Sequence, residues 1–282
     1  MTGASGRNRL RFVRSFTLAW AVLGALPALA QFTPEELAER PKWESFLLTA
    51  EIADSEQIRG DLAVTSPWKL DLKADGIARV ALWKNPEGMI GGYLEGWRYE
   101  IAAYLLDKYL GLGMVPPTVE RRFRGDRGSI QLWIPDCMTL KVKLEKKIKT
   151  PMIKVLNWNR ATYIQRAWDN LIANEDRHTN QILVTPDFRT VLIDHSRSFR
   201  IGKKFTKELL YSERHRSGPK LMSELPRAFV AKLKEMTPDA VRTIAGGYLK
   251  EAEIAAVLVR RDLILAEIDR LIRESGEANV LY

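Results

Sequence analysis

Cysteine is almost missing from this sequence. Cys137 is the only one in 282 residues, so no disulfide can form within the chain. With only three histidines beside it, no familiar zinc-ligand spacing occurs. The sequence also lacks a Gly-x-x-x-x-Gly-Lys-Ser/Thr phosphate loop and a Gly-x-Ser-x-Gly nucleophile elbow. These absences argue against a zinc enzyme, a P-loop nucleotidase and an elbow-type hydrolase, and they leave the fold to its hydrophobic core.

Low-complexity tracts and internal repeats are absent too. Hydrophobic residues make up 46% of the chain and charged residues 28%, which is typical of a globular protein. Of the formal net charge of +9, four units come from arginines in residues 1–30, which carry no acid, so five remain for the rest. This excess is compatible with an anionic ligand or an acidic substrate. Because no helix combines a basic stripe with stacking aromatics, we expect no nucleic-acid partner.

The N-terminus has the order of an export signal. Four arginines precede an apolar run from Phe16 to Leu26, and Ala28-Leu29-Ala30 supplies small residues before Gln31. The run is shorter than the ~20 apolar residues of a membrane span. We predict that residues 1–30 are a signal peptide, that the protein is exported to the periplasm or secreted, and that no stable span remains after cleavage. The alternative is an uncleaved anchor.

Residues 31–135 are predicted to form a strand-rich lobe with one helix. Alternating residues at 68–72, a tight Asp75-Gly76 turn and a second strand at 77–84 indicate a β-hairpin. The other expected elements of this lobe are a glycine-rich connection at 88–96, a helix at 97–110 that ends at Gly111, and a strand at 129–134.

Residues 136–282 are predicted to form a helical lobe. Apolar residues at helical spacing indicate a largely buried helix at 159–172, and a polar loop follows at 174–180. Two short strands, 181–184 and 190–193, then flank a turn. Helices fill the remainder, including a long amphipathic one at 251–273. The two halves together predict an α+β fold of two lobes.

The polar residues around this small hairpin offer a catalytic constellation. Asp176 follows the buried helix and Asp194 ends an apolar strand, so the hairpin brings both to one mouth. An unpaired buried charge is costly, which favours a use for Asp194. Phosphoryl transfer needs a cation for the phosphates, a carboxylate for the metal and another to orient the attacking hydroxyl. Taken alone, either aspartate could instead cap a turn or pair with an arginine.

These motifs carry a resemblance to a known superfamily. Asp-Arg-His at 176–178 followed by Ile-Asp-His at 193–195 is similar to the catalytic loop and metal-binding motif of the phosphoinositide 3- and 4-kinase-like superfamily. The similarity is strongest to bacterial atypical kinases and to secretory-pathway kinases of the four-jointed type. Val80–Lys84 resembles the strand with the ATP-phosphate lysine, and Glu100 matches the glutamate that pairs with it. Gly111–Thr118 is also typical of these relatives, so the resemblance extends over much of the chain.

The resemblance implies a kinase that binds ATP with Mg²⁺ or Mn²⁺ between a strand-rich and a helical lobe. Lys84 would contact the phosphates and Glu100 would hold it. Asp176 would orient the acceptor hydroxyl, His178 would stabilise the transferred phosphoryl, and Asp194 would bind the metal. The adenine would lie near Trp133 and Ile134.

One departure affects the metal site. The superfamily pattern Asp-Arg-His-x-x-Asn places Gln181 where asparagine is expected, and Asn180 lies one residue earlier, so either amide could bind the metal. The phosphate loop has no clear motif and is assigned to residues 60–67. We expect transfer of the γ-phosphoryl to a hydroxyl on a protein. The alternatives are a lipid or sugar kinase, an adenylyl transferase, or a pseudokinase that serves as a scaffold.

A basic stretch follows Asp194. It could steer an acidic substrate to the cleft, or it could be a solvated loop. Its members are Arg197, Arg200, Lys203, Lys204, Lys207, Arg214 and Arg216.

Overall fold

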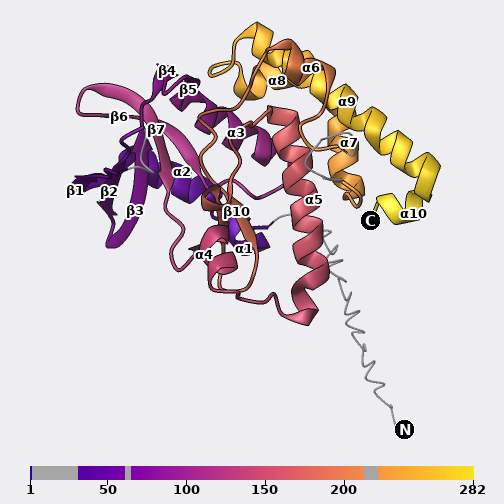
Figure 1. Ribbon diagram of the computed structural model, residues 1–282. Coiled ribbons are helices and arrows are strands. Elements are labelled where there is room, and N and C mark those ends of the chain that lie inside the picture. Colours follow the sequence, from indigo (N-terminus) through magenta and orange to yellow (C-terminus); the bar gives the residue numbers. More distant parts are fainter. Residues whose placement is uncertain (2–30, 61–64, 213–221) are drawn as a thin grey trace.

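A five-stranded antiparallel sheet forms the centre of the N-terminal lobe in the computed structural model, which describes residues 1, 31–60, 65–212 and 222–282 (Figure 1). The strand order is β1-β2-β3-β7-β6. The strands are β1 (Glu51–Gln57), β2 (Trp68–Ala74), β3 (Ile77–Lys84), β6 (Thr118–Phe123) and β7 (Asp126–Leu132). The predicted signal peptide, part of the expected phosphate loop, Arg214 and Arg216 lie outside the described residues.

The hairpin predicted from the alternating pattern is β2–β3. Ala74 pairs with Ile77, and the two residues between them, Asp75 and Gly76, have φ angles of 50° and 75°. Two successive positive φ angles are the turn geometry that matches strand twist, and Asp-Gly tolerates them. The hairpin places Lys84 at the end of β3. The strand expected at 129–134 is β7, which begins three residues earlier and ends at Leu132.

Two helices precede the sheet, so the prediction of a single helix in residues 31–135 is wrong. They are α1 (Pro34–Ala38) and α2 (Arg40–Thr49). Thr33 and Glu36 form a capping box at the start of α1. Helix α2 buries Trp43, Phe46 and Leu47 against the sheet, where they join its core. The capping box was visible in the sequence as Thr-Pro-Glu-Glu.

The glycine-rich stretch expected to be a plain connection is a second hairpin. Strands β4 (Glu87–Ile90) and β5 (Tyr93–Gly96) pair around Gly91 and Gly92, which both have positive φ angles. Helix α3 (Trp97–Leu110) follows directly and ends at Gly111, as predicted, with a φ of 70°.

The C-terminal lobe is helical around a small sheet of order β10-β9-β8. Its helix α5 begins four residues before the predicted start, and the two predicted short strands are β9 and β10. The elements are β8 (Met138–Thr139), α4 (Leu140–Glu145), η1 (Met152–Lys154), α5 (Val155–Ile172), η2 (Thr179–Gln181), β9 (Ile182–Val184), β10 (Thr190–Leu192), α6 (Lys203–Lys207), α7 (Arg227–Glu235), α8 (Pro238–Ala245), α9 (Glu251–Ser275) and α10 (Glu277–Val280). No described helix is long and apolar enough to cross a bilayer.

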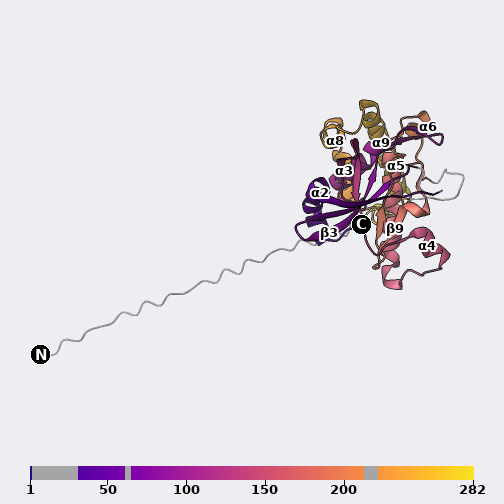
Figure 2. The ribbon, with the colours of Figure 1, turned by 90° about the vertical axis from the view of Figure 1, so that its left-hand side faces the viewer.

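Two hydrophobic clusters fill the molecule. The smaller one lies between α2 and the five-stranded sheet. The larger one joins α5 and α7–α9 with α3, although α3 lies between strands of the first lobe in the chain. Figure 2 shows α3 close to α8, and the two helices are in contact. The Tyr99 hydroxyl of α3 donates to Glu253 Oε1 of α9 at 2.6 Å. The predicted α+β, two-lobed architecture is confirmed, and α3 is bound to the helical lobe as well as to the sheet.

Candidate active site

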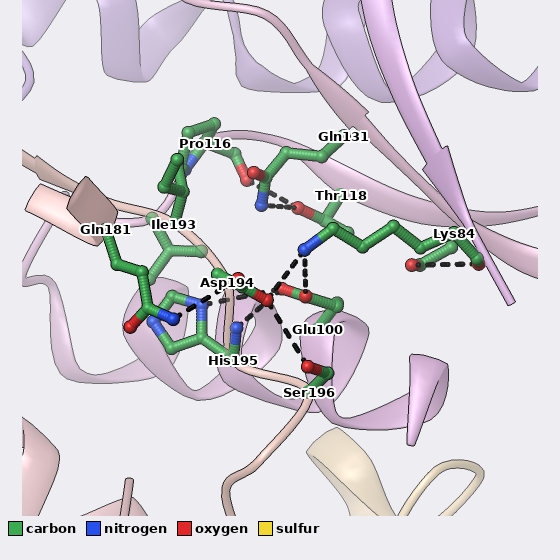
Figure 3. Close-up of polar contacts among 12 residues, drawn as sticks. Lys84, Glu100, Pro116, Thr118, Gln131, Gln181, Ile193, Asp194, His195 and Ser196 are labelled. Carbon is green, nitrogen blue, oxygen red and sulfur yellow. Dashed lines mark hydrogen bonds and ion pairs between the residues drawn. The ribbon is translucent and has the colours of Figure 1, made fainter. Parts of the chain in front are cut away.

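Three charged side chains from distant parts of the chain meet at the junction of the lobes (Figure 3). Lys84 Nζ lies 3.0 Å from Glu100 Oε1 and 2.7 Å from Asp194 Oδ1. Lys84 is 7% exposed and Glu100 2%. Burial lowers the pKa of Lys84, but the two carboxylates outweigh it and the net pKa is raised. Burial raises the pKa of Glu100, but Lys84 outweighs it and the net pKa is lowered, so both groups are charged.

Asp194 lies two residues beyond the end of β10, in a left-handed backbone conformation. Its φ is 61°, in the left-handed region that few residues other than glycine, asparagine and aspartate adopt readily. Arg177 supports the backbone just before Asp194 and in the other loop of the site: its guanidinium donates to the carbonyl of Ile193 at 2.6 Å and to that of Gln181 at 3.2 Å. Arg177 also pairs with the buried Asp169 of α5. Arg177 therefore holds the two loops of the site together, and strain of this kind is common where function requires it.

His195 is fully buried beneath the charged trio. Its backbone N–H donates to Glu100 Oε2 at 2.9 Å, and its Nε2 accepts from the Trp168 indole at 3.5 Å. Its Nδ1 faces Glu100 Oε2 at 3.6 Å. Burial lowers the pKa of His195, which keeps the ring neutral near neutral pH. The sequence favours a plain polar loop residue at position 195, and that prediction is wrong: the side chain is fully buried, and the backbone N–H beside it donates to the carboxylate that pairs with Lys84.

The amide of Gln181 lies between the two aspartates of the motif. Its Nε2 donates to Asp176 Oδ2 at 3.3 Å and to Asp194 Oδ2 at 3.2 Å. Its Oε1 is buried and has no hydrogen-bond partner. Rotation of the side-chain amide by half a turn would exchange Oε1 and Nε2. The oxygen would then face the same space as the two carboxylates, where a cation could bind all three.

This donor set fits a hard divalent cation. Two carboxylates and an amide oxygen are the ligands that Mg²⁺ accepts when it also binds substrate phosphates. Among the described residues, no group of three or more His, Cys, Asp or Glu side chains is placed to hold a metal, so phosphates or water would have to complete the coordination. The Asn180 side chain also lines the cavity, and its backbone N–H donates to His178 Nδ1 at 3.3 Å.

Two residues of the site were missed by sequence reasoning. Arg197 NH1 lies 3.2 Å from Asp176 Oδ1, and its Nε donates to Glu95 Oε1 at 2.5 Å. Its guanidinium also stacks on Tyr93 of the β4–β5 hairpin. Glu95 is buried, and its second oxygen has no partner. Position 197 was visible only as one of several basic residues, and Glu95 lay in a stretch expected to be a connection.

A cavity of about 370 Å³ opens over these groups. Most of the predicted site residues line it, including His178, Asn180 and Trp133, whereas Ile134 is not part of the lining and Glu100 lies behind Lys84. Thr65 and Pro67, from the expected phosphate loop, also border it. Leu82 of β3 and Gln131 of β7 line it as well, and Trp133 follows the end of β7. A volume of this size is typical of a site for a small ligand.

Arg200, from the basic stretch, is paired instead of free. It is buried and donates to Glu175 Oε1 at 2.8 Å, and Lys204 lies 3.2 Å from the other oxygen of Glu175. Lys203 and Lys207 are exposed. The part of the stretch that the structure describes therefore divides into structural and solvated members.

Comparison with known proteins gives the fold and not a sequence family. No protein-family model matches the chain, and no curated protein does. Solved structures do match: hydra Fam20 with sugar superimposes with a TM-score of 0.62 at 15% identity, covering 87% of this chain and 92% of that one. The Golgi casein kinase with Mn/ADP bound gives a TM-score of 0.61 at 16% identity, covering 90% and 80%.

A bacterial structure is similar over a larger share of its own length. The Helicobacter pylori proinflammatory kinase CtkA gives a TM-score of 0.50 at 13% identity, covering 81% of this chain and 98% of that one. At these identities the likeness shows an atypical kinase-like fold. It does not single out the phosphoinositide-kinase-like superfamily named from the motifs.

Proposed function

We propose that this protein is an ATP-dependent phosphotransferase that transfers the γ-phosphoryl group to a hydroxyl. The observation that carries the proposal is Lys84, which bridges Glu100 and Asp194 at the edge of a cavity that Asp176 also lines. Phosphoryl transfer needs positioned charge and little covalent chemistry from the protein. A cation, a metal-binding carboxylate and a second carboxylate within one cavity supply those charges.

The nucleotide would lie between the lobes. Lys84 would contact its phosphates while Glu100 keeps the ammonium in place. The adenine would lie near Trp133, Leu82 and Gln131, which border the cavity on the sheet side. One neighbour was solved with Mn/ADP, which supports a nucleotide and a divalent metal here.

Asp194, with Gln181 or Asn180, would hold Mg²⁺ or Mn²⁺. The metal, when bound, supplies positive charge for the phosphate oxygens. The orphaned Gln181 Oε1 favours Gln181 over Asn180 as the amide ligand. Replacement of asparagine by glutamine would therefore leave the site competent, with a longer side chain performing the same task.

Asp176 would orient the acceptor hydroxyl and accept its proton. Its two oxygens are held by Arg197 and by Gln181, which fixes the plane of the carboxylate. His178 is exposed at the mouth and would contact the transferred phosphoryl group. The acceptor that we propose is a hydroxyl on a protein. A sugar hydroxyl is the second candidate, because one neighbour was solved with a sugar.

We also propose that the protein is exported, as the arginines and apolar run of residues 1–30 support. Cell fractionation of the tagged full chain tests this proposal. Recovery of an N-terminus at Gln31 outside the cytoplasm supports it, and an intact, cytoplasmic chain contradicts it.

The function is tested first by nucleotide-dependent stability. At about 100 times its dissociation constant, ATP with Mg²⁺ or Mn²⁺ should stabilise the native state by about 2.7 kcal/mol, which moves the unfolding midpoint visibly. Asp194→Asn should lose the metal-dependent part, because asparagine tolerates the left-handed backbone but lacks the charge.

Turnover separates an enzyme from a scaffold. Metal-dependent release of ADP by the wild-type chain, absent from Asp176→Asn and Asp194→Asn, would establish transfer. A metal-dependent shift without turnover on protein or sugar acceptors would favour the pseudokinase. A folded chain that no nucleotide stabilises would end the proposal.

A further inference from the structure

Helix α4 lies at the end of the molecule opposite α8 (Figures 1 and 2). The segment from α4 through η1 to the start of α5 exposes several apolar side chains. Met152 is 90% exposed and Ile153 85%. Residues 144–156 hold five of the twelve exposed large hydrophobic residues described after Met1. These five are Leu144, Met152, Ile153, Val155 and Leu156. We call this surface, spanning residues 140–156, the α4–α5 face. Concentrated exposure of this kind marks an interaction site.

The α4–α5 face is held in position by the fold. Lys143 is buried, and its Nζ donates to the carbonyl of Ile148 at 2.7 Å, which closes the loop after α4. The same ammonium lies 4.8 Å from the ring centre of Trp158 in α5. At the other end, the Thr139 hydroxyl caps α4 by accepting from the backbone N–H of Val142. These contacts brace α4 and the loop after it, and η1, which carries Met152 and Ile153, packs against α5.

Lysines are frequent in the same segment. Residues 140–156 contain six lysines and one acid, Glu145. Lys143 is used internally, and Lys141 lies 3.8 Å from Glu145. The segment has four further lysines, three exposed and one half-buried: Lys146, Lys147, Lys149 and Lys154.

We propose that the α4–α5 face docks the protein peripherally on an anionic lipid bilayer. Aliphatic side chains would enter the interface between head groups and acyl chains, while the lysines contact the anionic head groups. The composition favours a bilayer over a protein partner. Protein interfaces are enriched in aromatic residues and arginine and depleted in lysine, whereas residues 140–156 contain no aromatic residue and no arginine.

The docking surface lies beside the candidate active site. Helix α4 contacts η2, the turn that carries Asn180 and Gln181, and it also contacts β9. A bilayer on the α4–α5 face would therefore lie near the loop that we assign to the acceptor. The docking itself does not depend on phosphotransfer, so it can be tested without any substrate.

Vesicle co-sedimentation of the full chain is the first test. Binding to vesicles of equal parts phosphatidylcholine and phosphatidylglycerol should exceed binding to phosphatidylcholine alone, and salt should weaken it. A lysine near an anionic surface contributes a factor of about 5 in affinity, so Lys146→Glu/Lys147→Glu/Lys149→Glu should weaken binding at least ~100-fold. Reversal of three exposed lysines elsewhere, Lys73, Lys207 and Lys234, is the control and should change little.

Every protein in this test retains residues 1–30, so any vesicle binding by the apolar run there is common to all. Equal binding by the wild type and the residue 146–149 variant, or equal binding to both vesicle types, would overturn the proposal.

A local probe gives an independent readout. In a Cys137→Ser background, Ile153→Cys carrying an environment-sensitive fluorophore should brighten on anionic vesicles, because position 153 leaves water. The same label at Leu48, an exposed position on α2, should not respond. A label at 153 that stays in water while the protein sediments would overturn the proposal. A second result would also overturn it: the protein self-associates, Met152→Ser/Ile153→Ser abolishes the self-association, and no vesicle binding is seen. The face would then be an interface between copies of this chain.

Discussion

Lysine is used in opposite ways at the cleft and at the α4–α5 face. Lys84 is buried and shared between two carboxylates, whereas Lys146, Lys147 and Lys149 extend into solvent beside exposed aliphatic side chains. The first arrangement fixes one ammonium to a precise place at the cost of desolvation. The second keeps hydrated charges available for a diffuse anionic surface. A buried lysine and an exposed lysine add the same formal charge to the protein. The groups around each lysine therefore decide whether its charge orders a site or attracts a partner.

The largest expected effect comes from breaking the buried trio. Lys84→Met leaves Glu100 as an uncompensated buried charge, so we expect the free energy of unfolding to fall by about 3–5 kcal/mol. Lys147→Met, at the surface, should change it little. Urea unfolding of both variants measures the contrast. The double variant Lys84→Met/Glu100→Gln should recover much of the loss, and a single variant as stable as the wild type would contradict the buried pairing.

A smaller effect is expected from Arg197, which connects the cleft to the β4–β5 hairpin. Arg197→Met frees one oxygen of Asp176 and leaves the buried Glu95 unpaired. Misplacement of an orienting carboxylate should lower kcat roughly 10- to 100-fold, while KM for the nucleotide stays near its wild-type value. Steady-state kinetics at saturating acceptor, once the acceptor is known, measure kcat and the nucleotide KM separately and so check this prediction. An unchanged kcat, or a nucleotide KM that rises alone, would argue against a positioning role.

The smallest effect is a pH dependence carried by His195. Glu100, Arg177 and Asp169 are the charged groups around the ring, and burial lowers its pKa below the ordinary 6.5. Below about pH 6.5 the unfolded chain therefore binds a proton that the folded chain does not. Stability should fall as the pH decreases, by at most about 1.4 kcal/mol per pH unit.

Unfolding free energies between pH 5 and 7 test the His195 contribution, above the range in which carboxylates dominate. His195→Gln should flatten the slope relative to the wild type, and His178→Gln, at the exposed histidine, is the matched control. Equal slopes in the wild type and His195→Gln would assign the dependence to other groups.

Local patterns in the sequence were sufficient to predict the elements that position the site. The Asp75-Gly76 turn places Lys84 at the end of its strand, Gly111 ends the helix of Glu100, and the spacing of the two motifs predicts the β9–β10 hairpin. Each of these signals acts within a few residues, because turn and cap chemistry depends on single positions.

The features that the sequence did not predict depend on long-range contacts or on glycine-rich stretches whose pattern is ambiguous. Arg197 and Glu95 are 102 residues apart, and nothing local to either predicts their pairing. The β4–β5 hairpin was hidden because Gly91 and Gly92, which make its turn, are equally typical of a loop. Exposure of Met152 and Ile153 could not be foreseen either, since apolar residues before a buried helix ordinarily join its core.

The attachment of α3 to the helical lobe has a consequence for regulation. Many kinases are controlled by moving the helix that bears the lysine-pairing glutamate. Here that helix carries Tyr104, Leu106 and Leu110 into the main core and is tied to α9 through Tyr99. An outward swing would have to take these side chains out of the core and break the Tyr99–Glu253 hydrogen bond. In the phosphotransferase that we propose, the lysine–glutamate pair would therefore form with the fold itself, and control would act on what enters the cleft instead of on this helix.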